Sequence, residues 1–370
     1  MNRLPLHALC PYFAMFPETF VRKHVETYSC PGDVVYDPFC GRGTTILESL
    51  LMGRVAVGSD ISPVAYCVSA AKAQRPDLAH LLRRLERLEA EYKDTRCSVL
   101  KSERHALPPF FRHAFQWETL NEIIFLRRAL RWKEIKTDRF IAALVLGSLH
   151  GEMDKSSAYF SNQMPRTICL KPDYSIRFWR ERGMKAKRRN VFRLLHQRAE
   201  WRLKEFPAVE RGEVKMTDAR NASGCFPHLL GSVSLVVTSP PYLQVTRYEE
   251  DQWLRLWFLG GPPHPTYRRI SRDDRHQRAT DYWRFMDESW RGVAPLLKKN
   301  AAMVVRIGGL GISEKELAIG LRTSLSGAFS KIETIQTPRR SNIKHRQAKN
   351  FLPESEGCKY ELDFVFRVVH

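Results

Sequence analysis

The feature that most constrains the fold of this chain is a succession of strand, glycine turn, helix and strand within residues 33–60. The segment DVVYDPF (33–39) is rich in β-branched and aromatic residues, and it stops at the turn GRGTT. An apolar-periodic helix follows, and RVAVGSD (54–60) then reads as a second buried strand. Parallel strands need a crossover of this kind, and a right-handed crossover brings both strand ends to one edge of a sheet. The sequence therefore predicts an α/β domain.

Five further strand signals follow later in the chain. They lie at residues 212–218, 232–242, 301–309, 329–337 and 359–369. A basic segment without helical periodicity joins the last two, so we expect these strands to pair antiparallel. The sequence thus predicts a three-layer α/β sandwich around a seven-stranded mixed sheet.

Residues 74–210 differ from the rest of the chain, because their apolar residues recur at helical spacing and loop signals separate the segments. This stretch holds 29 lysines and arginines against 17 acidic residues, and the whole chain has a formal net charge of +20. So basic a protein most readily has a polyanion as its partner, which favours nucleic acid. We expect a domain of residues 1–73 and 211–370 that carries the sheet. Residues 74–210 would form a basic helical insert that contacts nucleic acid.

The eight cysteines are scattered without a CxxC pair or a cysteine–histidine pair at metal spacing. This spacing argues against a zinc site, and we expect free thiols and no bound metal. The sequence also lacks an apolar run of membrane-spanning length and a signal-peptide core at its start. A reducing, cytoplasmic location without membrane contact is therefore expected.

Two motifs resemble those of a known family. DPFCGRGTT (37–45) is similar to the cofactor loop of the S-adenosylmethionine-dependent DNA amino-methyltransferases, and TSPPY (238–242) is similar to their catalytic loop. An upstream segment, PYFAMFPETF (11–20), resembles the aromatic and proline motif that borders the methionine end of the cofactor in many of them. The resemblance implies a Rossmann-like methyltransferase fold, S-adenosylmethionine as cofactor, and methyl transfer to an amino group of a DNA base.

Several acidic and hydroxyl side chains are candidate cofactor ligands. Asp60 ends the second strand, where a carboxylate accepts hydrogen bonds from ribose hydroxyls; a helix cap ahead of Ser62 is the alternative. The resemblance implies that Asp37 lies near the methionine portion of the cofactor and that Asp218 receives its adenine amine; a loop-capping role is the alternative for Asp218. The predicted cofactor-binding residues are Phe16, Asp37, Pro38, Cys40, Gly41, Gly43, Thr44, Asp60, Ile61, Asp218, Ala219 and Thr238.

The TSPPY loop suits chemistry on an exocyclic amine, whose lone pair must be localised before it attacks a methyl sulfonium. The Ser239 hydroxyl and the Pro240 carbonyl are acceptors for that amine, and Pro241 helps to hold the loop rigid. Tyr242 is expected to stack on a base flipped out of the duplex. A rigid turn with a packed tyrosine is the alternative.

Within the family, Ser at the position of Ser239 is associated with cytosine N4, and Asp or Asn at that position with adenine N6. We therefore expect DNA cytosine-N4 methylation. Adenine-N6 methylation, methylation of an amino group in RNA, and a noncatalytic nucleic-acid-binding role stay as alternatives. A partner restriction endonuclease and the oligomeric state are left open.

The insert, residues 74–210, is expected to serve DNA target recognition, and it contains two candidate DNA-binding clusters. Asn162 and Gln163 are suited to adenine edges and Arg166 to guanine, while Tyr159 or Phe160 would stack on a base. Closely spaced charges on one helix suit phosphates, and the second cluster is predicted there; it consists of Lys185, Lys187, Arg188 and Arg189. A solvated helical lid is the alternative for the whole insert.

Overall fold

The structure is a computed structural model of the 370-residue chain. It describes residues 4–12, 16–95, 97–153, 158–165, 170–204, 206–207, 210, 212–244, 248–266, 278–342 and 360–369, apart from the side chains of Cys97 and Asn342. The chain divides into two compact units. The sheet unit comprises Tyr12–Gln74, Pro207–Tyr248 and Arg269–His370, and the helical unit comprises Met1–Pro11, Arg75–Phe206 and Glu249–Arg268.

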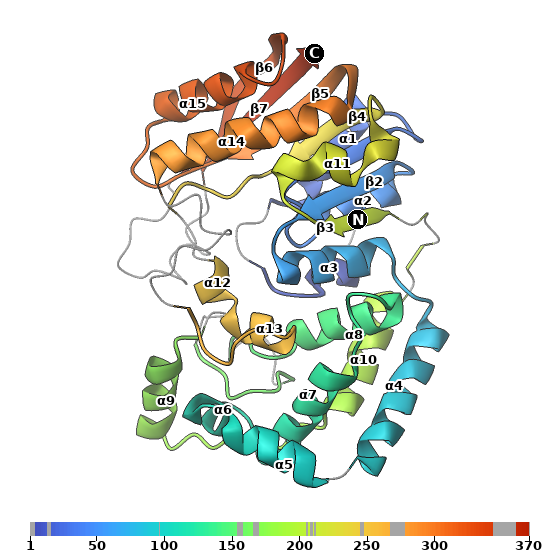
Figure 1. Ribbon diagram of the computed structural model, residues 1–370, viewed down its shortest axis with the longest axis vertical. Coiled ribbons are helices and arrows are strands. Elements are labelled where there is room, and N and C mark those ends of the chain that lie inside the picture. Colours follow the sequence, from blue (N-terminus) through green and yellow to red (C-terminus); the bar gives the residue numbers. More distant parts are fainter. Residues whose placement is uncertain are drawn as a thin grey trace. The chain divides into compact units, whose positions relative to one another are not determined.

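The sheet unit is built on a mixed sheet of seven strands in the order β3-β2-β1-β4-β5-β7-β6 (Figure 1). β1 to β5 are parallel where they pair, and β7 runs antiparallel to both of its neighbours, β5 and β6. The seven strand segments and the antiparallel pairing of the last two are therefore confirmed. The strands are β1 (Val34–Asp37), β2 (Val55–Asp60), β3 (Glu213–Met216), β4 (Val233–Thr238), β5 (Leu297–Ile307), β6 (Lys331–Asn342) and β7 (Tyr360–Val369).

Helices cover both faces of this sheet, because alternate strand residues point to opposite sides. Val35 packs with Val21 of α1 in one cluster, whereas the next residue, Tyr36, packs in another with Trp290 of α14 and Leu321 of α15. Three layers result, as predicted. The α-helices of this unit are α1 (Glu18–Tyr28), α2 (Thr44–Leu51), α3 (Pro63–Ala73), α11 (Ala222–Cys225), α14 (Ala279–Val293) and α15 (Glu314–Ser326). The described residues of this unit also form the 3₁₀ turns η2 (Ala219–Asn221), η3 (Pro227–Leu229) and η5 (Ala294–Leu296).

The helical unit holds residues 75–206 of the predicted insert 74–210, and two further segments that the sequence did not assign to the insert. The N-terminal turn belongs here because Arg202 donates to the carbonyl of Pro5 at 2.6 Å. The second segment belongs here because Trp257 packs on Phe111, with ring centroids 4.5 Å apart. The elements are η1 (Pro5–Ala8), α4 (Leu78–Asp94), α5 (Cys97–Ala106), α6 (Pro109–Ala114), α7 (Trp117–Ala129), α8 (Lys136–Leu146), α9 (Pro172–Glu181), α10 (Val191–Leu203), α12 (Tyr248–Asp251) and α13 (Trp253–Phe258).

The predicted helix beneath the basic cluster is wrong. α9 ends at Glu181, and residues 184–190 form neither helix nor strand before α10 begins. Gly183 explains the break, because its φ of +59° is a left-handed conformation that ends a helix and that other residues rarely adopt. Lys185, Lys187, Arg188 and Arg189 therefore lie on a loop between two helices.

Among the described residues, Cys10, Cys30, Cys40, Cys67 and Cys225 are free thiols. The described part of the chain holds no group of three or more His, Cys, Asp or Glu side chains arranged to bind a metal ion. Its helices include none that is both long and apolar enough to cross a membrane.

Candidate active site

The two sequence motifs meet inside the sheet unit, because β1 and β4 are neighbours and each carries one motif at its carboxyl end. Asp37 ends β1 and is 1% exposed, while Thr238 ends β4 and is fully buried. The Thr238 hydroxyl donates to Asp37 Oδ1 at 2.6 Å, and the Phe39 amide donates to the same oxygen at 3.1 Å. Burial nevertheless raises the pKa of Asp37 to about 7. The site thus holds a buried carboxyl that titrates near neutrality.

Asp60, at the end of β2, ties the glycine turn to the start of α3. Its Oδ2 accepts the Gly41 amide and its Oδ1 accepts the Ser62 amide, both at 2.9 Å. Burial raises the pKa of Asp60 to about 6 although these amides favour the ionised form. Each carboxylate oxygen has a second lone pair, so the turn-holding role leaves acceptor capacity for a ligand.

Gly43 is the glycine that this turn cannot replace. Its φ is +73°, and a Cβ built on it would lie 2.9 Å from both Cα and Cβ of Ser69 on α3. The turn therefore needs glycine both for its backbone conformation and for the close approach of α3. Gly43 is also the N-cap residue of α2, so the free amides of that helix begin at this point.

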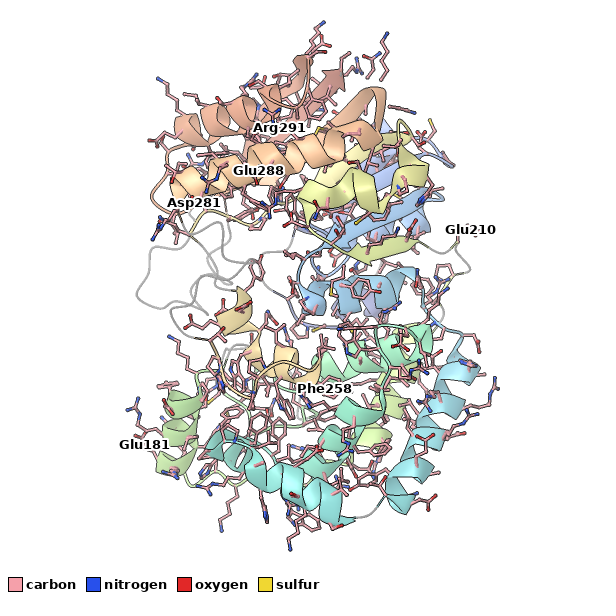
Figure 2. All side chains as sticks on the ribbon, in the orientation of Figure 1. Glu181, Glu210, Phe258, Asp281, Glu288 and Arg291 are labelled. Atoms are coloured by element: carbon pink, nitrogen blue, oxygen red, sulfur yellow. The ribbon has the colours of Figure 1, made fainter. Side chains whose placement is uncertain are left out.

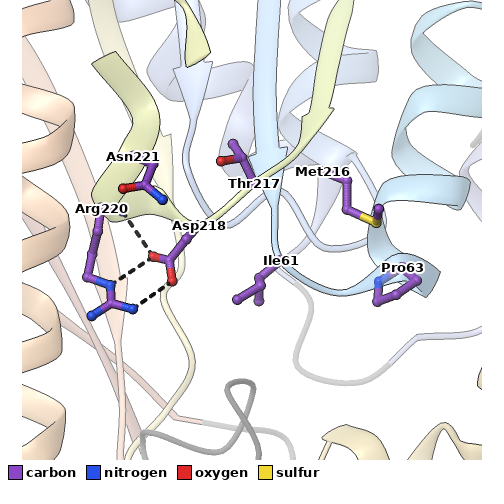
Figure 3. Close-up of a pocket in the computed structure, with 7 residues that line it drawn as sticks. All are labelled: Ile61, Pro63, Met216, Thr217, Asp218, Arg220 and Asn221. Atoms are coloured by element: carbon purple, nitrogen blue, oxygen red, sulfur yellow. Dashed lines mark hydrogen bonds and ion pairs between the residues drawn. The ribbon is translucent and has the colours of Figure 1, made fainter. Parts of the chain in front are cut away.

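A hollow of about 580 Å³ lies at the ends of β2 and β3 (Figure 3). Ile61 and Pro63 line it together with Asp218 and Arg220. Asp218 accepts the Arg220 backbone amide at 3.0 Å and pairs with its guanidinium at 3.1 Å. Arg220 also pairs at 2.8 Å with Glu288 of α14, which Figure 2 labels. Asp218 thus caps its loop and also lines the hollow, and its carboxylate is already paired with Arg220.

The other predicted cofactor residues sit close to this edge of the sheet or in its core. The Cys40 thiol contacts the Ser69 hydroxyl at 3.4 Å, and burial raises its pKa, which makes it a poor nucleophile. Thr44 accepts from Arg42 at 3.2 Å. Phe16 packs on Phe20 in the core at a centroid distance of 5.4 Å. Pro38 and Ala219 are buried.

The TSPPY loop follows β4 directly. The Ser239 hydroxyl donates to the Tyr242 hydroxyl oxygen at 3.3 Å, and the Tyr242 hydroxyl donates to Glu361 Oε1 on β7 at 2.8 Å. The Tyr242 side chain is 5% exposed, and burial raises its pKa well above the ordinary value. Pro240 is buried and Pro241 half-buried. In this conformation the Tyr242 ring is packed, so stacking on a base requires its exposure.

Three charged residues beneath this loop were not predicted from the sequence. Arg306 of β5 binds Asp363 of β7 through two bonds of 2.6 and 2.8 Å, and it pairs with Glu361 at 3.3 Å. The Arg306 guanidinium also lies 3.9 Å from the ring centroid of Phe20. A charged residue within an apolar strand, as in MVVRIGG and YELDFVF, was the available signal.

The predicted base-reading side chains of the helical unit are engaged within that unit. The Asn162 side-chain amide donates to the His113 carbonyl at 2.8 Å, and that of Gln163 donates to the Glu152 carbonyl at 2.9 Å. Tyr159 is 9% and Phe160 1% exposed. Arg166 lies outside the described residues. Contact between these side chains and bases stays a prediction, and it requires these bonds to open.

The basic loop offers a different picture. Lys185, Lys187 and Arg188 are exposed, and Arg189 is half-buried. Arg188 pairs with Glu122 and Glu118 of α7, so its charge is already compensated within the unit. Lys185 and Lys187 are the members of this cluster that best fit a contact with phosphates.

The segment that holds the first motif is similar to a known family. The family model of N6- and N4-type DNA methylases matches residues 5–71, which include β1, the glycine turn and β2. Among solved structures, TrmN from Thermus thermophilus aligns over 99% of this chain and 52% of its own, at 10% identity and a TM-score of 0.37. The fold is defined by the order and directions of the strands in the sheet.

Three curated relatives align over short stretches. Type II methyltransferase M.MjaII from Methanocaldococcus jannaschii is 33% identical over 76 residues, which are 20% of this chain and 14% of that protein. Orphan methyltransferase M.BamHII from Bacillus amyloliquefaciens is 43% identical over 54 residues, or 15% of this chain and 20% of its own. Type II methyltransferase M.BsoBI from Geobacillus stearothermophilus is 30% identical over 128 residues, or 32% and 23%.

The matched stretches span less than a quarter of the length of each of these relatives. All three relatives are named as methyltransferases, and the family model describes DNA methylases. In the sheet, β1 precedes the glycine turn of the matched segment and pairs with β4, which precedes the TSPPY loop. Residues 5–71 of the chain are thus similar to the N6/N4 DNA methylase family.

Proposed function

We propose that this chain is a DNA methyltransferase that moves a methyl group from S-adenosylmethionine to the exocyclic N4 of cytosine. The observation that carries the proposal is the junction of the two motifs, where Thr238 of the TSPPY segment hydrogen bonds to Asp37 of the glycine-turn segment at 2.6 Å. A cofactor turn alone is common to many nucleotide-binding proteins. Its direct bond to a TSPPY loop is not explained by those other functions.

The sheet unit fits the cofactor that this family implies. The 580 Å³ hollow lies beside Ile61 and Asp218, as an adenine site requires, and Asp60 has acceptor capacity for ribose hydroxyls. The amides at the start of α2 suit a carboxylate, and ionised Asp37 suits a cationic group. When bound, S-adenosylmethionine supplies an electrophilic methyl group on a sulfonium.

The loop after β4 would act on the base. The Pro240 carbonyl and Ser239 Oγ are acceptors that hold the two hydrogens of the target amine and localise its lone pair. A paired cytosine hides this amine, so the base must leave the duplex before it reaches the loop. The loop is held rigid by its prolines and by the Tyr242–Glu361 bond, which keeps the acceptors preorganised.

DNA as the partner is supported by charge. The chain has a formal net charge of +20, and the helical unit presents Lys185 and Lys187 on an exposed loop. The three curated relatives are named as methyltransferases, two of them of type II. A restriction endonuclease with the same DNA recognition sequence would fit the type II names of two of these relatives.

The residue Ser239 favours cytosine N4 over adenine N6, because the family associates serine at this position with cytosine. Adenine N6 is the second candidate, since the same two acceptors serve either amine. An RNA amino group is disfavoured by the match to a DNA methylase model. A noncatalytic role leaves the acceptors of the loop without a purpose.

Methyl transfer from labelled S-adenosylmethionine, measured in parallel on unmethylated DNA and on RNA, tests the proposal. We expect label in DNA and none in RNA, with both acceptors present at equal nucleotide concentration. The Ser239→Ala variant is the matched control, and its transfer rate should fall while its cofactor affinity is kept. Label in RNA alone would overturn the assignment of DNA as substrate.

A further inference from the structure

The TSPPY loop is anchored by a chain of hydrogen bonds that has a fixed direction. Ser239 donates to Tyr242, and Tyr242 donates to Glu361, at 3.3 and 2.8 Å. A hydroxyl has one hydrogen to donate and two lone pairs that accept. Once the Ser239 hydrogen points at Tyr242, Ser239 Oγ has only lone pairs for any other neighbour.

The buried end of this chain is negatively charged. Arg306 pairs with both Glu361 and Asp363, so one cation faces two carboxylates. His24 of α1 lies near this group, and burial lowers its pKa, so it adds no charge at neutral pH. Burial raises the pKa of Glu361, while Arg306 opposes that shift and favours the carboxylate. A carboxylate accepts hydrogen bonds and cannot donate them, which fixes the direction at Tyr242.

We propose that Glu361 is a positioning residue of the active site, which orients the Ser239 lone pairs toward the target amine through Tyr242. This inference rests on the proposed function and extends it. A freely rotating Ser239 hydroxyl would present its hydrogen to the amine hydrogens for part of the time, and the amine would lose an acceptor. With Glu361 in place, the acceptor is fixed before the base arrives.

The position of the residues fits this role better than a purely structural one. Arg306 and Asp363 already satisfy each other through two bonds, so the strand pair β5–β7 does not need Glu361 for a partner. Glu361 comes 119 residues after Tyr242, and β7 lies one strand beyond β5 in the sheet. The loop therefore takes its orientation from a strand that carries neither motif.

Single-turnover methyl transfer at saturating cofactor and DNA tests the inference. The variants are Tyr242→Phe, Glu361→Leu and Glu361→Gln, each also combined with Ser239→Ala. Tyr242→Phe and Glu361→Leu should slow transfer roughly 10-fold, the effect of removing one hydrogen bond of about 1.4 kcal/mol. Glu361→Gln should keep most of the rate, because its carbonyl oxygen still accepts from Tyr242. In the Ser239→Ala background, none of the three should slow transfer further.

Tyr360→Phe is the matched control, since Tyr360 is the neighbour of Glu361 on β7 and its hydroxyl donates to the Ile312 carbonyl at 2.6 Å. It should leave the rate unchanged. Cofactor affinity and the unfolding midpoint of each variant identify any that fold poorly. If Tyr242→Phe slows transfer by the same factor in the Ser239 and Ser239→Ala backgrounds, this inference is overturned and the proposed function is not. A wild-type protein that transfers no methyl group to nucleic acid would overturn the proposed function and this inference with it.

Discussion

Asp37 combines full burial with a pKa near 7, and this gives folding stability a defined pH dependence. The unfolded chain releases this proton near 3.8, whereas the folded chain keeps it until about pH 7. Since the folded state binds more protons in that window, stability should fall as the pH rises from about 4 to 7 and then level off. Asp60, with its pKa raised to about 6, adds a smaller contribution of the same sign.

The variant Asp37→Asn removes the titrating group and keeps an acceptor oxygen. Between pH 4.5 and 8, the unfolding midpoint of the variant should rise relative to that of the wild type as the pH increases. Thermal unfolding followed by circular dichroism gives both curves. Parallel curves across this range would show that Asp37 does not titrate there.

Asp60 is the residue on which cofactor affinity should depend most. Loss of hydrogen bonds from a charged acceptor costs about 1.5 to 3 kcal/mol, so Asp60→Ala should weaken S-adenosylmethionine binding roughly 10- to 100-fold. Asp281→Ala is a matched control, because Asp281 is a half-exposed aspartate on α14 that pairs with Arg284 (Figure 2). Titration calorimetry compares the two, and equal affinities for both variants would contradict the role.

At the scale of the element, the α9–α10 loop separates binding strength from sequence choice. Neutralising Lys185, Lys187 and Arg189 should weaken binding to every DNA sequence, because phosphates carry no sequence information. The log–log salt slope should shrink by about 0.9 for each DNA phosphate that the variant no longer neutralises. Arg188 is spared, since its pairs with α7 make its loss a folding defect.

A second triple variant, with Arg83, Arg87 and Lys93 of α4 neutralised, removes the same charge from exposed positions elsewhere in the helical unit. Affinity as a function of salt, measured by fluorescence anisotropy, compares the two triples. If both change the slope equally, net charge and not the loop governs binding.

The strands β1, β2 and β4 were predictable because each is a short, mostly apolar run with a clear stop. β1 and β4 also carry a motif at their ends, so the meeting of Asp37 and Thr238 followed from parallel neighbours in a sheet. The helix through Lys185 was mispredicted because a glycine only disfavours a helix and does not by itself end one. The left-handed backbone of Gly183, which ends α9, is visible only in the structure. A single glycine has many uses, and the sequence did not single this one out.

The Glu361 contact marks the limit of sequence reasoning. Its partner Tyr242 is distant in the chain, and the sequence does not say that β7 inserts beside β5 and not at the sheet edge. The basic insert posed the same problem at Asn162, because a polar loop residue suits a base edge and a backbone carbonyl equally well. In the structure, the Asn162 side-chain amide donates to the His113 carbonyl.

At the scale of the whole molecule, the two units divide the chain differently from the charge pattern. The helical unit takes the apolar segment WLRLWF of α13, since Trp253 and Trp257 pack on Phe110 and Phe111. It also takes residues 1–11, where Leu6 and Leu9 are buried. The apolar sequence of α13 predicts that this helix is buried, but it does not predict in which of the two units.

Nucleoside mass analysis of DNA, after reaction with the purified protein and S-adenosylmethionine, tests cytosine-N4 methylation directly. The substrate is genomic DNA from a strain without modified bases, digested to nucleosides after incubation. We expect N4-methylcytosine as the product, formed more slowly by the Ser239→Ala variant. N6-methyladenine as the sole product would contradict the assignment of cytosine from Ser239, and DNA without any methylated base would contradict the account as a whole.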